Sequence, residues 1–92
     1  MGLTFVMLAD IPAGGESAFQ RYESLVLPLL DRHGGQLERR LRTDDALAEV
    51  HVVSFSSKDG YESYMADPER QSHRAVLDGV DVAQRLLQVH DV

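Results

Sequence analysis

The sequence predicts an α+β sandwich in which strands and helices follow the order β-α-β-β-α-β. Three observations lead to this order. An almost wholly apolar segment, Leu3–Ala9, predicts a buried first strand, and an amphipathic segment ending in paired glycines, Glu16–Gly35, predicts a helix. An alternating segment, Gln36–Arg42, then precedes a valine-rich one, Ala48–Phe55. With right-handed crossovers this order gives a ferredoxin-like sandwich, an antiparallel sheet with helices on one face.

The first helix is expected from Glu16 to about His33. Its apolar residues recur three and four positions apart, which predicts one buried stripe of Phe19, Tyr22, Val26, Leu29 and Leu30. Pro28 lies inside it and has no N–H to bond Ser24, so a kink is expected. Gly34 is expected to end the helix in the left-handed conformation.

The next two strands form a predicted hairpin around a turn at residues 43–45. In the first of them, Leu37 and Leu41 alternate with polar residues, which predicts that the two leucines share one face. The opposite face then carries Gln36, Glu38, Arg40 and Arg42. The partner strand is Ala48–Phe55.

A serine and an aromatic stripe define the start of the second helical region. Ser56 is predicted to cap the helix, with Asp59 three residues later in a variant of the capping box. The stripe consists of Tyr61, Tyr64 and Met65. It is expected to face the sheet.

The chain after this stripe predicts a further helical segment and a last strand. Asp67 and Pro68 have the residue types of a cap and a first helical position, so a helix is expected from there to about Leu77. Gly79 is expected to close it, and the final strand is predicted at Val82–Val89.

Composition limits the class of protein. The chain has 92 residues and is expected to form one domain, residues 1–92. It contains no cysteine, which excludes disulfides and thiolate metal ligands. The formal net charge of −6 argues against nucleic acid and anionic membrane surfaces as partners. No targeting or membrane-spanning pattern is recognised, so a cytoplasmic location is expected.

The first strand also predicts a partner. Phe5 and Met7 point to one face of the sheet and Val6 and Leu8 to the other, so both faces are apolar. Helices can cover only one of them. We therefore expect a homodimer in which two sheets pack face to face.

Three segments carry a resemblance to a known superfamily. They are the helix end, with Tyr22-Glu23, Val26, Pro28-Leu29-Leu30 and His33-Gly34-Gly35; the strand end Val52–Ser57; and Tyr64–Arg74, especially Asp67-Pro68-Glu69-Arg70. In these places the chain resembles the dimeric α+β barrel superfamily, particularly small bacterial families near the antibiotic-biosynthesis-monooxygenase-like and NIPSNAP-like proteins. The resemblance implies a dimer and a ligand pocket between the sheet and the helices of each subunit. It is specific for fold and not for activity.

His51 is the candidate catalytic residue. It lies in the middle of the valine-rich strand and shares a face with Glu49, Val53 and Phe55. If Phe55 packs beneath the helices, His51 lines the same pocket and can act as a general base or orient a substrate hydroxyl. The simpler interpretation is a hydrogen-bonded histidine at the sheet rim or the dimer interface.

Three tyrosines and an arginine are the candidate substrate-binding residues. Tyr22, Tyr61 and Tyr64 lie on predicted buried helix faces, where they either bind a ligand oxygen or belong to the core. Arg40 shares a face with Arg42, with Glu49 across the hairpin. This arrangement is read as a fork for a substrate carboxylate or as an ion-pair ladder. No histidine spacing typical of a metal site is present, and no metal or cofactor is expected.

Two functions agree with these residues. The first is a cofactor-independent enzyme, monooxygenase- or isomerase-like, acting on an aromatic or apolar metabolite. The alternative is a non-catalytic ligand-binding or regulatory dimer module, since amino-acid-binding regulatory domains share the same element order. An RNA-binding module is excluded by the net charge and by the lack of exposed aromatics on the third strand. A pocket that reaches His51 would favour the enzyme.

Overall fold

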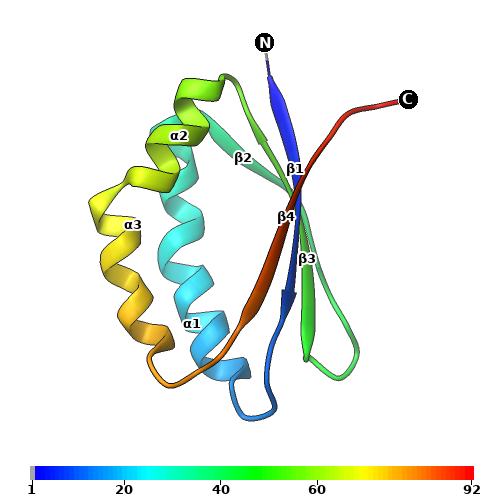
Figure 1. Cartoon of the computed structure of the whole chain (residues 1–92), viewed down its shortest axis with the longest axis vertical. Helices are drawn as coiled ribbons and strands as arrows, with labels where there is room; N and C mark the ends of the chain where they lie inside the picture. Colours follow the sequence, from blue (N-terminus) through cyan, green and yellow to red (C-terminus); the bar gives the residue numbers. More distant parts are fainter. Residues whose placement is uncertain (1) are drawn as a thin grey trace.

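A computed structural model, which describes residues 2–92, contains a four-stranded antiparallel sheet with all helices on one face (Figure 1). The strand order is β2-β3-β1-β4, so the ferredoxin-like prediction is confirmed. The elements are β1 (Leu3–Asp10), α1 (Glu16–Val26), η1 (Leu27–His33), β2 (Gly35–Arg42), β3 (Ala48–Phe55), α2 (Lys58–Ala66), α3 (Pro68–Ser72), η2 (His73–Leu77) and β4 (Ala83–Val89), where η denotes a 3₁₀ helix. Within residues 2–92, no helix is long and apolar enough to cross a membrane.

The proline changes the helix type. The α-helix α1 ends at Val26, and η1 continues as a 3₁₀ helix with Pro28 in its first turn. A residue without an N–H is tolerated there, because the first N–H groups of a helix have no internal partner. Gly34 then ends η1 with a φ of 69°, as predicted from the glycine.

The alternation predicted for β2 is wrong after Leu37. A β-bulge at Glu38 shifts the register, so that Leu37 pairs with Val53 but Arg40 pairs with His51. The extra residue reverses the facing of everything that follows it. Arg40 and Arg42 therefore lie on the helix-covered face, whereas Leu41 is 43% exposed on the other.

The cap of α2 also differs from the prediction by one residue. Ser57, not Ser56, is the N-cap, and its side-chain oxygen accepts a hydrogen bond from Gly60 N at 3.0 Å. Ser56 instead extends the pairing of β3 with β2 by one hydrogen bond, because its N–H donates to Gly34 O. Either serine could cap a helix by residue type, and the end of β3 decides which one does.

Asp67 is the predicted cap of α3. Its Oδ1 accepts hydrogen bonds from Glu69 N at 2.9 Å and Arg70 N at 3.4 Å. Pro68 occupies the first helical position. This cap fixes the direction in which α3 leaves α2 and therefore places Arg70.

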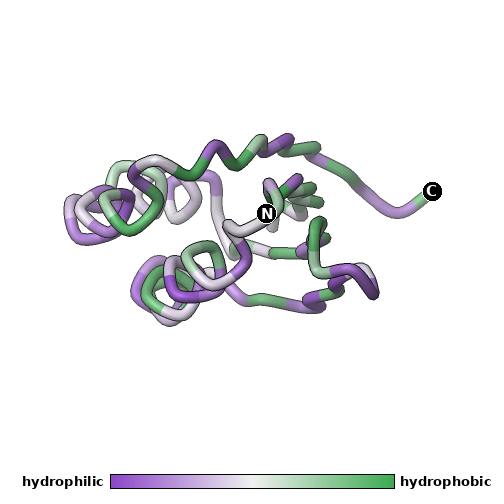
Figure 2. The backbone as a smooth tube through the Cα atoms, turned by 90° about the horizontal axis from the view of Figure 1, so that it is seen from below, coloured by the Kyte–Doolittle hydropathy of each residue, from purple (hydrophilic) through white to green (hydrophobic). Residues whose placement is uncertain are grey.

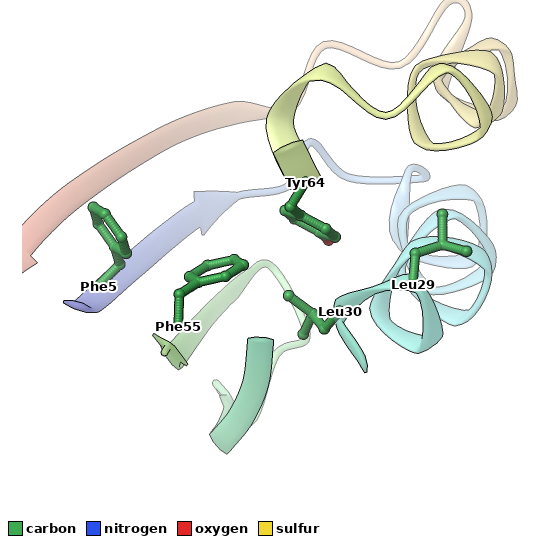
Figure 3. Packing of buried hydrophobic residues seen from close by; sticks show 5 residues of the cluster. All are labelled: Phe5, Leu29, Leu30, Phe55 and Tyr64. Carbon is green, nitrogen blue, oxygen red and sulfur yellow. The ribbon is translucent and has the colours of Figure 1, made fainter. Parts of the chain in front are cut away.

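An aromatic and aliphatic cluster joins the sheet to the helices (Figure 3). It consists of Phe5, Leu29, Leu30, Phe55 and Tyr64. Each of these side chains is at most 8% exposed, and burial of one such residue contributes about 1.5–3 kcal/mol. The cluster holds η1 and α2 against β1 and β3.

The other face of the sheet has no helix on it, and Figure 2 shows the helices gathered on one side of the strands. Val6 pairs with Val52 and Leu87 on this face, and Leu8 pairs with Val50. All five side chains are partly exposed to solvent. We call this apolar surface, made by Val6, Leu8, Val50, Val52 and Leu87, the open face.

Candidate functional site

A cavity of about 260 Å³ lies between the sheet and the helices. Most of its wall is apolar and includes Phe5, Val26 and Phe55. Its polar lining residues are Tyr22, Glu23, His51, Tyr61, Tyr64, Arg70 and Gln84. An apolar cavity with a few convergent polar groups is the usual form of a small-molecule site.

His51 reaches the cavity from the middle of β3 and is 2% exposed. Its Nε2 lies 2.8 Å from Glu49 Oε1. An ionised carboxylate only accepts hydrogen bonds, so Nε2 carries the proton and donates it to Glu49. Burial lowers the pKa of His51, although the bond to Glu49 acts in the other direction. In the neutral ring, Nδ1 is then unprotonated and available as a base.

Glu49 is held ionised by three donors. Arg40 donates from Nε to Oε1 at 2.8 Å and from a terminal nitrogen to Oε2 at 3.3 Å, and Arg42 Nε donates to Oε2 at 2.9 Å. Burial raises the pKa of Glu49, but the hydrogen bonds from Arg40, His51 and Arg42 outweigh it and lower the pKa to about 2. We call Arg40, Arg42, Glu49 and His51 the Glu49 cluster.

Glu23 of α1 is a second buried carboxyl group at the cavity, 4% exposed. Burial raises its pKa to about 7; Arg40 and Arg70 oppose the rise and Glu49 adds to it. Its Oε2 lies 3.8 Å from His51 Nδ1, too far for a hydrogen bond. Near neutral pH, Glu23 is therefore divided between its acid and base forms beside the free nitrogen of His51.

The sequence interpretation missed Glu23. The signal was present, because Glu23 lies four residues after Phe19 and three before Val26, on the buried stripe of α1. A carboxyl group inside an apolar stripe is expensive to bury, so its position in the pattern marks a functional candidate.

The three tyrosines predicted from the sequence all line the cavity. Tyr61 stacks on Phe5 with ring centroids 4.4 Å apart. Tyr64 is buried and its hydroxyl donates to Val26 O at 3.4 Å. Burial raises the pKa of Tyr64, so its hydroxyl stays protonated and can donate a hydrogen bond.

Arg70 also reaches the cavity, from α3. Its guanidinium carbon lies 4.7 Å from the centroid of the Tyr64 ring, within the range of a cation–π contact. Its Nε is buried and has no hydrogen-bond partner among residues 2–92.

Arg40 does not line this cavity. The fork that the sequence suggested for a substrate carboxylate is occupied by Glu49 of the same chain. The bulge in β2 explains this, because it turns Arg40 towards the buried face.

A second histidine and carboxylate pair lies away from the cavity, where η1 meets α3. His33 Nε2 is 2.6 Å from Asp67 Oδ2, and Arg32 bonds both Asp67 and Glu69 at 3.1 Å. The bond from His33 is the main cause that lowers the pKa of Asp67 to about 2. We call Arg32, His33, Asp67 and Glu69 the Asp67 cluster. Across residues 2–92, no group of three or more histidine and acidic side chains is arranged to hold a metal ion.

Several solved structures resemble this chain in fold. A proposed antibiotic biosynthesis monooxygenase from Nitrosomonas europaea has a TM-score of 0.81 at 10% identity, covering 99% of this chain and 90% of that one. The fold is that of the antibiotic-biosynthesis-monooxygenase-like proteins. SnoaB, a cofactor-independent oxygenase from Streptomyces nogalater, has a TM-score of 0.75 at 18% identity, covering 99% of this chain and 95% of its own.

A NIPSNAP domain protein, from the second group named in the sequence analysis, is also similar to this chain. An uncharacterized NIPSNAP domain protein from Burkholderia xenovorans has a TM-score of 0.76 at 15% identity, covering 98% of this chain and 94% of that one. These likenesses confirm the fold predicted from the sequence. No protein-family profile and no curated protein matches the chain.

Proposed function

We propose that this protein is a cofactor-independent enzyme that binds an aromatic or otherwise apolar metabolite in the cavity and abstracts a proton from it. The observation that carries the proposal is the cavity itself, which brings an oriented neutral histidine and a buried carboxyl group to one apolar space. The likeness to SnoaB, described as a cofactor-independent oxygenase, supports the same class of chemistry.

In the proposed reaction, His51 Nδ1 takes a proton from an acidic C–H or O–H group of the ligand. Glu49 orients the ring and stabilises the imidazolium that forms, because its negative carboxylate lies beside the other ring nitrogen, Nε2. Glu23, with a pKa of about 7, can receive a proton from the cavity or return one to it. An apolar wall strengthens each of these interactions by excluding water.

The fate of the resulting anion determines the type of reaction. Reprotonation at another atom makes the reaction an isomerisation. Reaction with dioxygen, which then serves as the oxidant, makes it an oxygenation. Both outcomes share the first proton transfer, so that step is the one to test.

The test uses 2-tetralone, an aromatic ketone with acidic C–H groups, dissolved in D₂O and followed by proton NMR. The protein is expected to accelerate loss of the α-proton signal, and His51→Ala is expected to reduce the acceleration by about a hundredfold or more. His51→Asn is a second variant that can keep a hydrogen bond to Glu49 but lacks the base. His90→Ala, which removes an exposed histidine, is the matched control.

The results distinguish the two functions considered for this chain. Equal exchange rates for the protein and for both His51 variants would reject the proposed base. Binding of 2-tetralone without any exchange above the buffer rate would favour the non-catalytic binding module.

We further propose that the protein is a homodimer packed through the open face. A surface formed by Val6, Leu8, Val50, Val52 and Leu87 is too apolar to be left to solvent without cost. Light scattering is expected to give twice the mass of the 10.3 kDa chain, and Val52→Lys to give the monomer mass. A monomeric unmodified protein would reject this arrangement.

A further inference from the structure

We propose that Arg70 binds an oxyanion of the ligand, so that the cavity selects a small apolar acid, such as an aromatic carboxylate, over its neutral analogue. This inference rests on the proposed use of the cavity as a ligand site and adds the chemical class of the ligand. The acid group would lie at Arg70, and the apolar body would extend along Tyr61 and Phe5 towards His51.

The first observation is one unpaired donor on the Arg70 guanidinium, its Nε. Arg70 Nε is buried without a hydrogen-bond partner in the part of the chain that the structure describes, residues 2–92. A buried donor left unpaired costs about 1–3 kcal/mol, and more for a charged group. Arg70 also lines the cavity, so a ligand oxygen there can meet its guanidinium.

The second observation is that the acidic residues nearest to Arg70 in the sequence, Asp67 and Glu69, already have other hydrogen-bond partners. Asp67 accepts from His33 and Arg32 and caps the N-terminus of α3. Glu69 is bonded to Arg32 at 3.1 Å. Neither carboxylate is paired with Arg70, and its positive charge therefore has no counterion in either of them.

Glu23, the carboxyl group that lines the cavity, does not supply the missing counterion of Arg70 either. Glu23 contributes to the field at Arg70, but burial raises the pKa of Glu23 to about 7, so a substantial fraction of it is uncharged near neutral pH. It makes no hydrogen bond to Arg70 within residues 2–92. An anionic ligand would neutralise the guanidinium more completely.

The surroundings of Arg70 favour an oxyanion over a neutral acceptor. Its guanidinium carbon lies 4.7 Å from the centroid of the Tyr64 ring, and this cation–π contact helps to hold the guanidinium at the cavity. Hydrogen bonds from arginine to a carboxylate are shorter and about twice as strong as neutral ones. An apolar wall raises this advantage, since screening by water is reduced there.

The size of the cavity limits the ligand. Its volume of about 260 Å³ is just below the range of about 300–1,000 Å³ that is usual for ligand pockets. A ligand with one or two rings fits this volume. The stacked pair of Phe5 and Tyr61, with centroids 4.4 Å apart, offers aromatic surface for such a ring.

The experiment compares 2-naphthoate with 2-naphthalenemethanol, which have the same ring system and differ in charge, by isothermal titration calorimetry at neutral pH. The protein is expected to bind the acid about tenfold more tightly or better, the ratio for one charge-assisted hydrogen bond. In Arg70→Gln this preference is expected to disappear while the affinity for the alcohol changes little. Arg70→Lys is expected to keep part of the preference, because it retains the charge without the planar fork.

Arg74→Gln is the matched control, since Arg74 is exposed on η2 and does not line the cavity. It is expected to leave the preference unchanged, and circular dichroism of each variant checks that it is folded. Three results would overturn the inference: equal binding of acid and alcohol, a preference that survives in Arg70→Gln, or no binding of 2-naphthoate at millimolar concentration.

The outcome is separable from that of the proposed proton abstraction. An Arg70-dependent preference for the acid, together with no exchange of 2-tetralone protons, would leave the acid site standing and reject the enzyme. Exchange that depends on His51, with no Arg70-dependent preference, would leave the enzyme standing and reject the acid site.

Discussion

The Glu49 cluster and the Asp67 cluster contain the same chemical pair in different settings. In each, a histidine Nε2 lies close to a carboxylate, at 2.8 Å in the Glu49 cluster and 2.6 Å in the Asp67 cluster. In each, the pKa of the carboxyl group is lowered to about 2 and arginine contributes to the shift. Nothing in the pair itself distinguishes a reactive group from a structural one.

The difference lies in what surrounds each histidine. His51 is 2% exposed, lines a cavity, and has the carboxyl group of Glu23 3.8 Å from its other ring nitrogen. His33 is not among the residues that line that cavity, and its carboxylate partner also caps a helix. The comparison indicates that a histidine–carboxylate pair becomes a candidate site only where a second titratable group and a cavity lie beside it.

The largest expected effect separates the two clusters by activity. Glu49→Gln removes the charge that orients His51, so the proton exchange of 2-tetralone is expected to fall by about a hundredfold. Asp67→Asn makes the same change in the Asp67 cluster and is expected to leave the exchange rate nearly unchanged. NMR in D₂O measures both rates. A similar loss in the two variants would show that the clusters do not differ in role.

The next effect concerns the dependence of stability on pH. Burial raises the pKa of Glu23 from 4.5 to about 7, so its contribution to stability is complete below pH 4.5 and is lost as the pH rises to about 7. Glu23→Gln removes this loss, and the free energy of unfolding of the variant relative to the wild type should rise by up to about 3 kcal/mol across that range.

His51, whose pKa is lowered, changes the stability in the opposite direction with pH, so the difference between the two proteins is the quantity to measure. Urea unfolding at several pH values supplies it, with Glu62→Gln, an exposed glutamate on α2, as the control. A difference that stays constant from pH 4.5 to 7 would contradict a raised pKa for Glu23.

The smallest effect lies inside the Asp67 cluster. Arg32 is half exposed, with 51% of its side chain accessible, so Arg32→Ala is expected to shift the thermal midpoint by no more than about 2 °C. Asp67→Ala is expected to shift it by several degrees, because it removes a helix cap and the partner of His33. Thermal unfolding followed by circular dichroism compares them. Equal shifts would mean that the exposed ion pair, and not the cap, holds this junction together.

The position of His51 could be predicted because it depends only on local periodicity. Once Phe55 is assigned to the covered face, the two-residue period of a strand places His51 and Glu49 beneath the helices as well. The tyrosines on α1 and α2 followed from helical periodicity in the same way.

The features that escaped prediction depend on contacts between elements. The bulge at Glu38 is set by how β2 pairs with β3, and nothing in the order of residues in β2 alone specifies it. The unpartnered Nε of Arg70 depends on how α3 packs over α2, which sequence periodicity does not describe. Glu23 is different, since its place in the stripe was readable and only its polar type concealed it.

Because of the bulge, β2 contains one residue more than is needed to bring Arg40 and Arg42 to Glu49. If the same residues paired without a bulge, Leu41 instead of Arg42 would lie opposite Glu49, and a buried negative charge would lose its neighbours. Omitting Glu38 would give a straight strand in which Arg40 and Arg42 keep their present partners. Glu38 therefore acts as a spacer, held on the far side of the sheet by Ser54, whose hydroxyl donates to it at 2.7 Å. The two arginines that hold Glu49 beside His51 therefore depend on that spacer being looped out, and so on a residue that never touches the cavity.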